Sequence, residues 1–184
     1  MRRILFIVLL FTSVKLSSQN SVLYDSDFRF GFDVGYSVEG YLPMSLYFGK
    51  DKMVYGFTLG SPVGTGQKGE YYSNINWDEY PEDIVNSGSF YYPFTVDIGY
   101  SISEHFIIGG GLGYAVRLNY RNMYDDFHIL GDNGSYHITV TDGGVPEIKV
   151  FGQYIFPSES YIKVYIKGFY SNNMGPGGAI GFEL

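Results

Sequence analysis

Residues 27–39 read DFRFGFDVGYSVE, and every second position in this stretch carries a large apolar side chain. One face would hold Phe28, Phe30, Phe32, Val34, Tyr36 and Val38, and the other face would hold Arg29, Gly31, Asp33, Gly35, Ser37 and Glu39. A period of two places alternate side chains on opposite faces of a strand, whereas a helix would scatter these aromatic rings around its circumference. The stretch therefore predicts a β-strand with one apolar and one polar face.

Seven further stretches repeat this alternation, so the sequence predicts eight strands. They are residues 42–49, 53–60, 89–102, 105–120, 147–156, 162–170 and 177–184. Tight turns alternate with long polar segments, and residues 64–88 and 121–143 are predicted as loops on the side opposite to the tight turns. Short turns on one side and longer loops on the other are typical of outer-membrane barrels. The expected fold is all-β, an eight-stranded antiparallel up-and-down transmembrane β-barrel.

The polar face of these strands is rich in glycine and other small residues and carries few charges; Gly31, Gly35, Gly109, Gly111 and Gly113 all lie on it. A soluble lipocalin-like barrel would place its apolar face inside and a charged face in water. Glycines instead fit the narrow lumen of an eight-stranded barrel, and large Phe and Tyr residues fit contact with lipid. The pattern favours a membrane barrel, and a secreted soluble barrel that binds a small apolar ligand is the alternative.

The composition of the 184 residues narrows the functional classes. The chain has no cysteine, which excludes disulfides, thiolate metal sites and a cysteine nucleophile. A formal net charge of −7 disfavours nucleic-acid binding. Residues 1–19, MRRILFIVLLFTSVKLSSQ, combine a basic start with an apolar run and predict a signal peptide. Its removal takes away three basic residues and no acidic one, so the remaining barrel domain, residues 20–184, carries a net charge of −10.

The signal peptide, the eight amphipathic strands, tight turns such as SISEH at residues 101–105 and an alternating apolar last strand resemble the small outer-membrane β-barrels of the OmpA/OmpX type. The resemblance covers nearly all of residues 27–184. It implies residence in the outer membrane of a Gram-negative bacterium. It also implies insertion by the barrel-assembly machinery, which in this family reads the last strand; Phe182 and Leu184 occupy the alternating terminal positions here. A monomer without a cofactor is expected.

Charged residues on the predicted inner face define the first candidate site. The expected lumen ion network consists of Arg29, Asp33, Asp97, Arg117, Glu147, Lys149, Lys163, Lys167 and Glu183. Because an isolated ion in a low-dielectric interior is costly, these groups are expected to pair. We expect a salt-bridged plug that fixes strand register. A narrow ion pathway is the alternative, but eight strands leave an interior just wide enough for side chains.

Aromatic residues interleaved with acidic ones define the second candidate site. The candidate loop binding surface consists of Tyr71, Tyr72, Trp77, Tyr80, Tyr124 and Phe127. Exposed aromatic residues can anchor a partner, and clustered carboxylates can attract divalent cations. The expected partners are outer-membrane lipid around the barrel and an external protein, glycan or divalent cation at the loops. A solvated acidic surface is the alternative interpretation of the same residues.

No motif in the chain predicts catalysis. His137 has Ser135, Asp132 and Asp142 nearby in a polar segment, which leaves a rim-sited lipid-modifying enzyme as a weaker alternative. The glycine-rich stretches lack the spacing of a phosphate-binding loop. We therefore expect a structural or adhesive barrel protein that acts through its external loops, without a catalytic residue, cofactor or metal.

Overall fold

The chain is almost entirely β-strand in the computed structural model, which describes residues 28–73, 76, 83–131 and 133–184. The strands are β1 (Phe28–Ser37), β2 (Tyr41–Lys50), β3 (Met53–Pro62), β4 (Glu70–Tyr71), β5 (Ile84–Ser103), β6 (Phe106–Tyr124), β7 (Ser135–Ile155), β8 (Lys163–Ser171) and β9 (Gly175–Glu183). Within these described ranges, no helix has the length and apolar character needed to cross a membrane. The predicted signal peptide, residues 1–19, lies outside the described residues.

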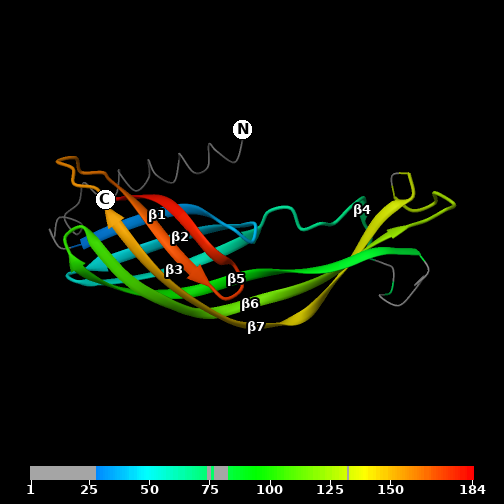
Figure 1. Cartoon of the computed structure of the whole chain (residues 1–184), viewed down its shortest axis with the longest axis horizontal. Helices are drawn as coiled ribbons and strands as arrows, with labels where there is room; N and C mark the ends of the chain where they lie inside the picture. Colours follow the sequence, from blue (N-terminus) through cyan, green and yellow to red (C-terminus); the bar gives the residue numbers. More distant parts are fainter. Residues whose placement is uncertain (1–27, 74–75, 77–82, 132) are drawn as a thin grey trace, which may run out of the picture.

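All the strands except β4 close into a barrel (Figure 1). Each strand pairs antiparallel with the next around the ring, and β9 returns to pair with β1, where Phe182 faces Phe32. The short strand β4 pairs in parallel with β7 through Glu70 and Tyr71, outside the ring. Closure removes the free edges of a sheet, so the backbone hydrogen bonds of the barrel are satisfied internally. The predicted eight-stranded antiparallel up-and-down barrel is confirmed.

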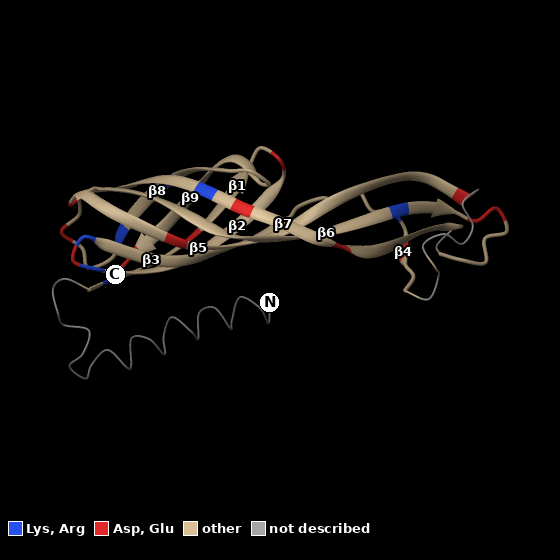
Figure 2. Ribbon diagram, turned by 90° about the horizontal axis from the view of Figure 1, so that it is seen from below, with Lys and Arg blue, Asp and Glu red and all other residues tan. Residues whose placement is uncertain are grey.

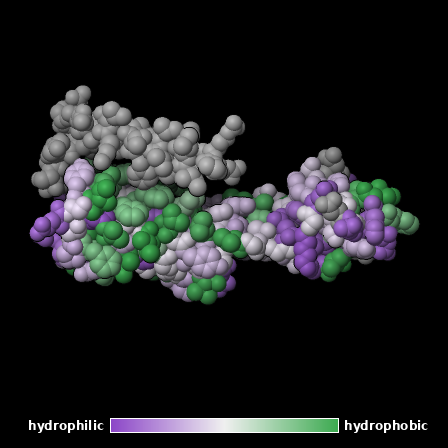
Figure 3. Space-filling view, turned by 90° about the horizontal axis from the view of Figure 1, so that it is seen from above, coloured by the Kyte–Doolittle hydropathy of each residue, from purple (hydrophilic) through white to green (hydrophobic). Residues whose placement is uncertain are grey.

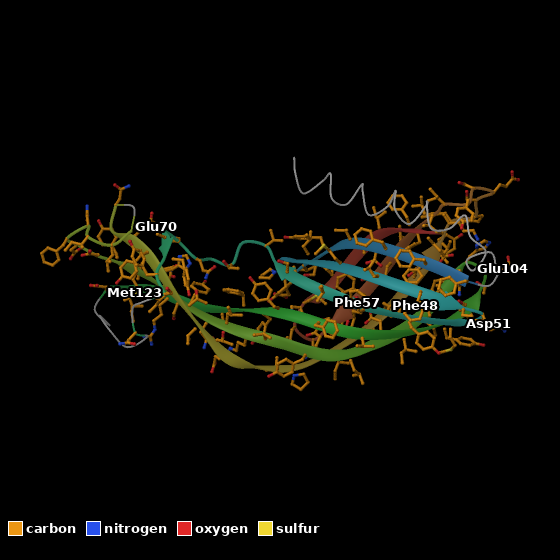
Figure 4. All side chains as sticks on the ribbon, turned by 180° about the vertical axis from the view of Figure 1, so that it is seen from behind. Phe48, Asp51, Phe57, Glu70, Glu104 and Met123 are labelled. Atoms are coloured by element: carbon orange, nitrogen blue, oxygen red, sulfur yellow. The ribbon has the colours of Figure 1, made fainter. Side chains whose placement is uncertain are left out.

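The large apolar side chains cover the outside of this barrel. Along β5, Val96 and Ile98 are 55% and 53% exposed, whereas Thr95 and Asp97, which alternate with them, point inward and are buried. The same alternation holds on neighbouring strands, and in Figure 4 Phe48 and Phe57 point away from the barrel wall. Figure 3 shows the resulting apolar surface over the barrel. The structure thus turns the polar, glycine-rich face of the strands toward the lumen.

The prediction of two long polar loops is wrong over much of their length. Strands β5, β6 and β7 contain 20, 19 and 21 residues, about twice the length of the other barrel strands, and they continue well beyond the ring. Residues 84–88, 121–124 and 135–143 are therefore strand and not loop. Figure 1 shows the outer parts of these strands projecting from one end of the barrel. We call this projection, the described residues of 64–91 and 118–141, the arm.

A β-bulge marks the junction between the barrel and the arm. On β6, Val116 pairs with Gly144 while Leu118 pairs with Thr141, so β7 contributes one residue more than β6 over this step. Gly143 takes a backbone φ of +65°, a conformation that a side chain would strain. Bulges bend a strand and increase its twist. The bulge therefore lies where the sheet stops following the curve of the barrel and leaves it as the arm.

The arm has a small core of its own, separate from the barrel interior. Met123, Tyr136 and Ile138 are buried together, with Ile84 and Leu130 packed against them. These residues come from three strands and from the segment between β6 and β7. The sequence predicts loop for residues 84–88, 121–124 and 135–143 because polar side chains lie on both faces of the arm sheet. The alternation of polar and apolar residues is therefore weak in these strands. The chain buries one of those faces against its own residues, as described below.

Candidate functional site

Asp97 on β5 is the centre of one charge cluster in the lumen. Figure 2 colours the acidic and basic positions along the strands. The Asp97 carboxylate Oδ2 accepts a hydrogen bond from Lys149 Nζ on β7 at 2.5 Å and from the Thr58 hydroxyl on β3 at 2.7 Å. Thr95 donates to Oδ1 at 2.8 Å, and Lys149 also donates to Thr58. The cluster joins β3, β5 and β7 across the lumen. A buried ion pair with this many added donors has the satisfied geometry that such a pair requires.

Asp33 on β1 is the centre of a second cluster. It pairs with Lys167 on β8, and the Tyr165 hydroxyl donates to Asp33 Oδ2 at 2.9 Å. The Phe151 ring lies between the clusters: its centroid is 5.4 Å from Lys167 Nζ and 5.6 Å from Lys149 Nζ. Both distances are within the range of cation–π attraction. The two ion pairs thus form one layered network with an aromatic ring between the two lysines.

The other two buried carboxylates of the lumen are held by neutral donors. Glu183 on β9 accepts a hydrogen bond from the Tyr47 hydroxyl at 2.6 Å. Glu147 on β7 accepts from the Ser171 hydroxyl and from Asn173 Nδ2, the latter at 2.5 Å. Ser171 is the last residue of β8 and pairs with Lys149 of β7. Through Ser171 and Asn173, Glu147 therefore connects the β8–β9 turn to β7. These contacts fix the register at opposite ends of the lumen.

Three of the predicted network residues lie elsewhere. Arg117 departs from the expected lumen position: it faces Asp142 across the bulge, with an N–O distance of 3.7 Å, and both side chains are about half exposed. It leaves the lumen because β6 has already left the ring at this residue. Arg29 bonds Ser101 Oγ at 2.8 Å at the mouth where the tight turns lie. Lys163 lines a pocket of about 440 Å³ at the same mouth.

Several inward aromatic side chains are not predicted by the sequence analysis. Tyr47, Phe151, Tyr165 and Phe169 lie on the inner face. The Tyr165 ring lies against Gly181 on β9, where a Cβ atom would clash with the ring and would come within 2.6 Å of the Phe32 carbonyl oxygen. The sequence does contain a signal for these residues: each aromatic residue stands where the alternation expects an inward polar residue, and glycine stands opposite it on the neighbouring strand. Such a pair predicts an inward ring lying over a glycine.

These side chains fill the middle of the lumen, between the mouth and the arm. A residual cavity of about 10 Å³ lies among Ser45, Asp97, Phe151 and Lys167. A cavity needs a volume of roughly 10–15 Å³ to hold one water molecule. The arrangement is that of a packed, salt-bridged interior, with room there for about one water.

Asn122 on β6 organises the arm. Its side chain is 2% exposed, and its Oδ1 accepts a hydrogen bond from the backbone N–H of Lys68 at 2.8 Å. Its Nδ2 donates to the carbonyl of Gly66 at 2.8 Å and to Asn86 Oδ1 at 2.7 Å. Gln67 donates to the Thr139 hydroxyl on β7 at 2.8 Å. Segment 66–68 is therefore fastened over one face of the arm sheet by side-chain hydrogen bonds.

Asp125 organises the far end of the arm. Its Oδ1 accepts from the backbone N–H of Phe127 at 2.8 Å, and its Oδ2 accepts from the N–H groups of Ile129 and Leu130 at 2.8 and 3.0 Å. Burial alone would raise the pKa of the Asp125 carboxyl. The three backbone donors outweigh burial and hold that pKa below its usual value. We call the segment that Asp125 holds, residues 125–131, the tip loop.

The predicted loop aromatics do not form one surface. Tyr71 is 57% exposed and its ring lies 5.6 Å from the His137 ring, whereas Tyr72 is half-buried against Tyr136 in the arm core. Tyr124 bonds His128 through its hydroxyl, and Phe127 is the most exposed of the group. Trp77 and Tyr80 lie outside the described residues. In Figure 4, Glu70 and Met123 show the position of the arm, and Asp51 and Glu104 mark the opposite end of the barrel.

The histidine of the weaker enzyme alternative faces the backbone. His137 Nδ1 lies 3.2 Å from the carbonyl oxygens of both Lys68 and Gly69. Asp142 pairs with Arg117, and Asp132 lies outside the described residues. In the part of the chain that the structure describes, no group of three or more His, Asp or Glu side chains is arranged to hold a metal ion. The geometry around His137 is that of a hydrogen-bonded edge residue of the arm.

Comparison with known proteins adds little to this geometry. No protein-family model matches the chain, and no curated protein sequence matches it. Among solved structures, the chain is similar to one described as "De novo design of transmembrane beta-barrels", at 10% identity, a TM-score of 0.34, and coverage of 85% of this chain and 92% of that chain. The argument for function therefore depends on the residues of this chain.

Proposed function

We propose that this protein is an integral outer-membrane β-barrel that holds the arm outside the membrane as an adhesive or binding surface, without catalysis. The observation that carries the proposal is the inverted distribution of side chains in the barrel. Large apolar residues cover its outside, while Asp33, Asp97, Lys149 and Lys167 are buried in its lumen. An apolar outer band around a closed ring of strands is what a bilayer requires, because lipid offers no partner for backbone or charged groups.

The soluble lipocalin-like alternative is supported less by this arrangement. That class needs a polar outer surface and an interior with room for a small apolar ligand. Here the described outer surface of the barrel is apolar, and the residual lumen cavity of about 10 Å³ lies beside Asp97 and Lys167. A contiguous apolar surface of this extent on a soluble monomer would itself promote aggregation.

The ends of the barrel support an orientation. The β2–β3, β5–β6 and β7–β8 connections and the last residue, Leu184, lie at one end, and the arm leaves the other end, beside the short β1–β2 and β8–β9 turns (Figure 1). Short turns face the periplasm and longer extensions face the exterior in outer-membrane barrels. We infer that the arm is external and that the barrel is inserted by the assembly machinery of the outer membrane.

The test compares one charge placed in the apolar belt with the same charge placed on the arm. Val96→Lys changes a belt residue that is 55% exposed, and Ile129→Lys changes a tip-loop residue that is 79% exposed. A lysine facing lipid costs about 2–4 kcal/mol near the bilayer midplane. We therefore expect Val96→Lys to lower the yield of folded protein in phosphatidylcholine vesicles, and Ile129→Lys to leave it unchanged.

Folding is followed by heat-modifiable gel mobility and by retention in the vesicle pellet after a urea wash. The parent protein should migrate faster when unheated and should stay with the vesicles. A monomer that remains soluble in buffer without detergent, with both lysine variants folding equally well, would contradict the proposal. The adhesive role is tested separately, by binding experiments on the arm.

A further inference from the structure

The tip loop places two large apolar side chains in solvent at the end of the most hydrophilic part of the molecule (Figure 3). Phe127 and Ile129 are 85% and 79% exposed, the two highest values among the large apolar residues that the structure describes. Residues of the lipid-facing belt are less exposed; Val96, for example, is 55% exposed. Neither the lipid-facing belt nor the arm core includes them.

The loop that carries them is ordered and strained. Asp125 accepts three backbone N–H bonds, and its own carbonyl accepts a fourth from His128 at 3.0 Å. His128 takes a backbone φ of +55°, a conformation that is strained for a residue other than glycine. The Tyr124 hydroxyl lies 3.0 Å from His128 Nε2 and holds that ring. Side-chain contacts of Asp125 and Tyr124 thus hold the strained backbone. In this conformation of the loop, the side chains of Phe127 and Ile129 point into solvent.

The surroundings of the loop are acidic. Among the described residues of segments 64–88 and 121–143, five are acidic and two are basic, a net charge of −3. Such a field attracts cationic partners over a distance set by the ionic strength and repels anionic lipid or a second copy of the same arm. A preformed loop also binds a matching pocket with a smaller loss of conformational entropy than a mobile loop would. Charge and order together favour a protein surface over a fluid bilayer.

We propose that Phe127 and Ile129 form the anchor of the arm for a protein partner whose surface offers an apolar pocket ringed by Lys and Arg. The inference rests on the proposed external position of the arm, and it names the part of the arm that makes the contact. Anchoring residues of this kind contribute most of the binding energy when a pocket buries them fully.

The experiment uses the full barrel in phosphatidylcholine nanodiscs and a phage library of random dodecapeptides as the probe. Enriched peptides are synthesised, and their affinities are measured by fluorescence anisotropy against the parent and four variants. Phe127→Ser removes an anchor, and Val38→Ser is its control, because Val38 is 77% exposed on the barrel turn between β1 and β2. Asp125→Ala releases the loop, whereas Asp126→Ala removes the same charge from an exposed neighbour.

We expect enriched peptides to combine Lys or Arg with an apolar residue and to bind more weakly in high salt. Phe127→Ser should weaken them by roughly tenfold or more, and Val38→Ser should leave them unchanged. Asp125→Ala should weaken them more than Asp126→Ala. Peptides that bind the arm equally well in Phe127→Ser would overturn the anchor and leave the binding role of the arm intact. The absence of any peptide that binds the arm would overturn both.

A second probe tests lipid as the occupant. Nanodiscs carrying the protein are mixed with phosphatidylcholine vesicles and floated on a density gradient. We expect the nanodiscs not to float with the vesicles. Flotation that depends on Phe127 would show that the tip loop enters a bilayer, and it would overturn the protein partner proposed here.

Discussion

The barrel and the arm share three strands but have opposite arrangements of polar and apolar side chains. In the barrel, Val96 and Ile98 face outward and Asp97 is buried between them. In the arm, Met123 and Ile138 are buried in a core, and hydrophilic side chains cover much of the surface (Figure 3). The reversal takes place within β6 and β7, on either side of the bulge that follows Val116.

In the membrane position proposed above, one sheet meets two solvents. A strand in lipid needs every backbone group paired and its charges turned inward. A strand in water needs its apolar face covered by other residues of the chain. The arm solves this problem by laying segment 66–68 over one face and by packing Ile84 and Leu130 into its small core. Each region should therefore respond differently when a polar contact is removed.

The largest difference is expected for charge pairs. Asp97→Ala leaves Lys149 buried without its carboxylate, which should lower the free energy of unfolding by about 3–5 kcal/mol. Asp142→Ala removes the carboxylate of the half-exposed pair with Arg117 at the junction, and it should cost less than about 1 kcal/mol. Urea unfolding of both variants in vesicles, followed by far-UV circular dichroism, measures the two costs.

Equal and small costs for the two variants would break the comparison, because they would mean that the lumen is wet enough to screen Lys149. A large cost for Asp142→Ala would break it from the other side, by showing that the junction is as closely packed as the lumen.

Glycine substitutions provide the next test, within the barrel. Gly181→Ala places a Cβ atom against the Tyr165 ring, whose hydroxyl is bonded to Asp33, and near the Phe32 carbonyl. Overpacking of this kind costs about 1–3 kcal/mol. Gly168→Ala is the control, because its Cβ would meet no heavy atom within 4 Å. A lower urea midpoint for Gly181→Ala alone would show that the lumen is packed to contact; matching midpoints would show that it has slack.

The barrel could be predicted from sequence because its outer surface is apolar throughout. Outward positions are every second residue of a strand, so large apolar side chains recur with a period of two, without interruption in residues 27–39. The inward aromatic residues were hidden for the same reason. Tyr47 and Tyr165 are apolar enough to resemble outward residues, and their inward position depends on glycine directly opposite in the neighbouring strand, Gly31 for Tyr47 and Gly181 for Tyr165.

The arm could not be predicted as strand because its contacts are specific and distant. Asn122 is buried by segment 66–68, more than fifty residues earlier, and nothing local in the sequence distinguishes it from an exposed asparagine. The alternation of β6 alone predicts that Arg117 faces the lumen. Beyond the bulge the strand leaves the ring, so alternation no longer separates lumen-facing from outward positions. Asp125 has the composition of a solvated loop acid; its role depends on three backbone N–H groups whose geometry appears only in the fold.

A smaller and local effect is expected at Asn122. Asn122→Ala leaves the N–H of Lys68 and the carbonyl of Gly66 without their partner, which should cost about 1–3 kcal/mol within the arm. Hydrogen exchange followed by mass spectrometry should show faster exchange in residues 64–73 and unchanged protection in β1 and β2. Asn119→Ala, which removes the bond from Asn119 to the half-exposed Asp142, is the control. A loss of protection that spreads into the barrel would mean that the two regions fold as one cooperative unit.

The smallest effect concerns the tip loop and pH. The pKa of Asp125 is lowered from 3.8 in the folded arm, so its ionised form stabilises the loop at all pH values well above 3.8. That contribution is lost as the pH falls below 3.8 and through the lower folded pKa, where protonation weakens the bonds from Phe127, Ile129 and Leu130. Amide NMR shifts of these three residues should therefore titrate together, with a midpoint below 3.8. Asp125→Asn should abolish the shared titration. A titration midpoint at or above 3.8, or three different midpoints, would mean that the Asp125 carboxylate does not hold the loop. The exposure of Phe127 would then not depend on the hydrogen bonds to Asp125.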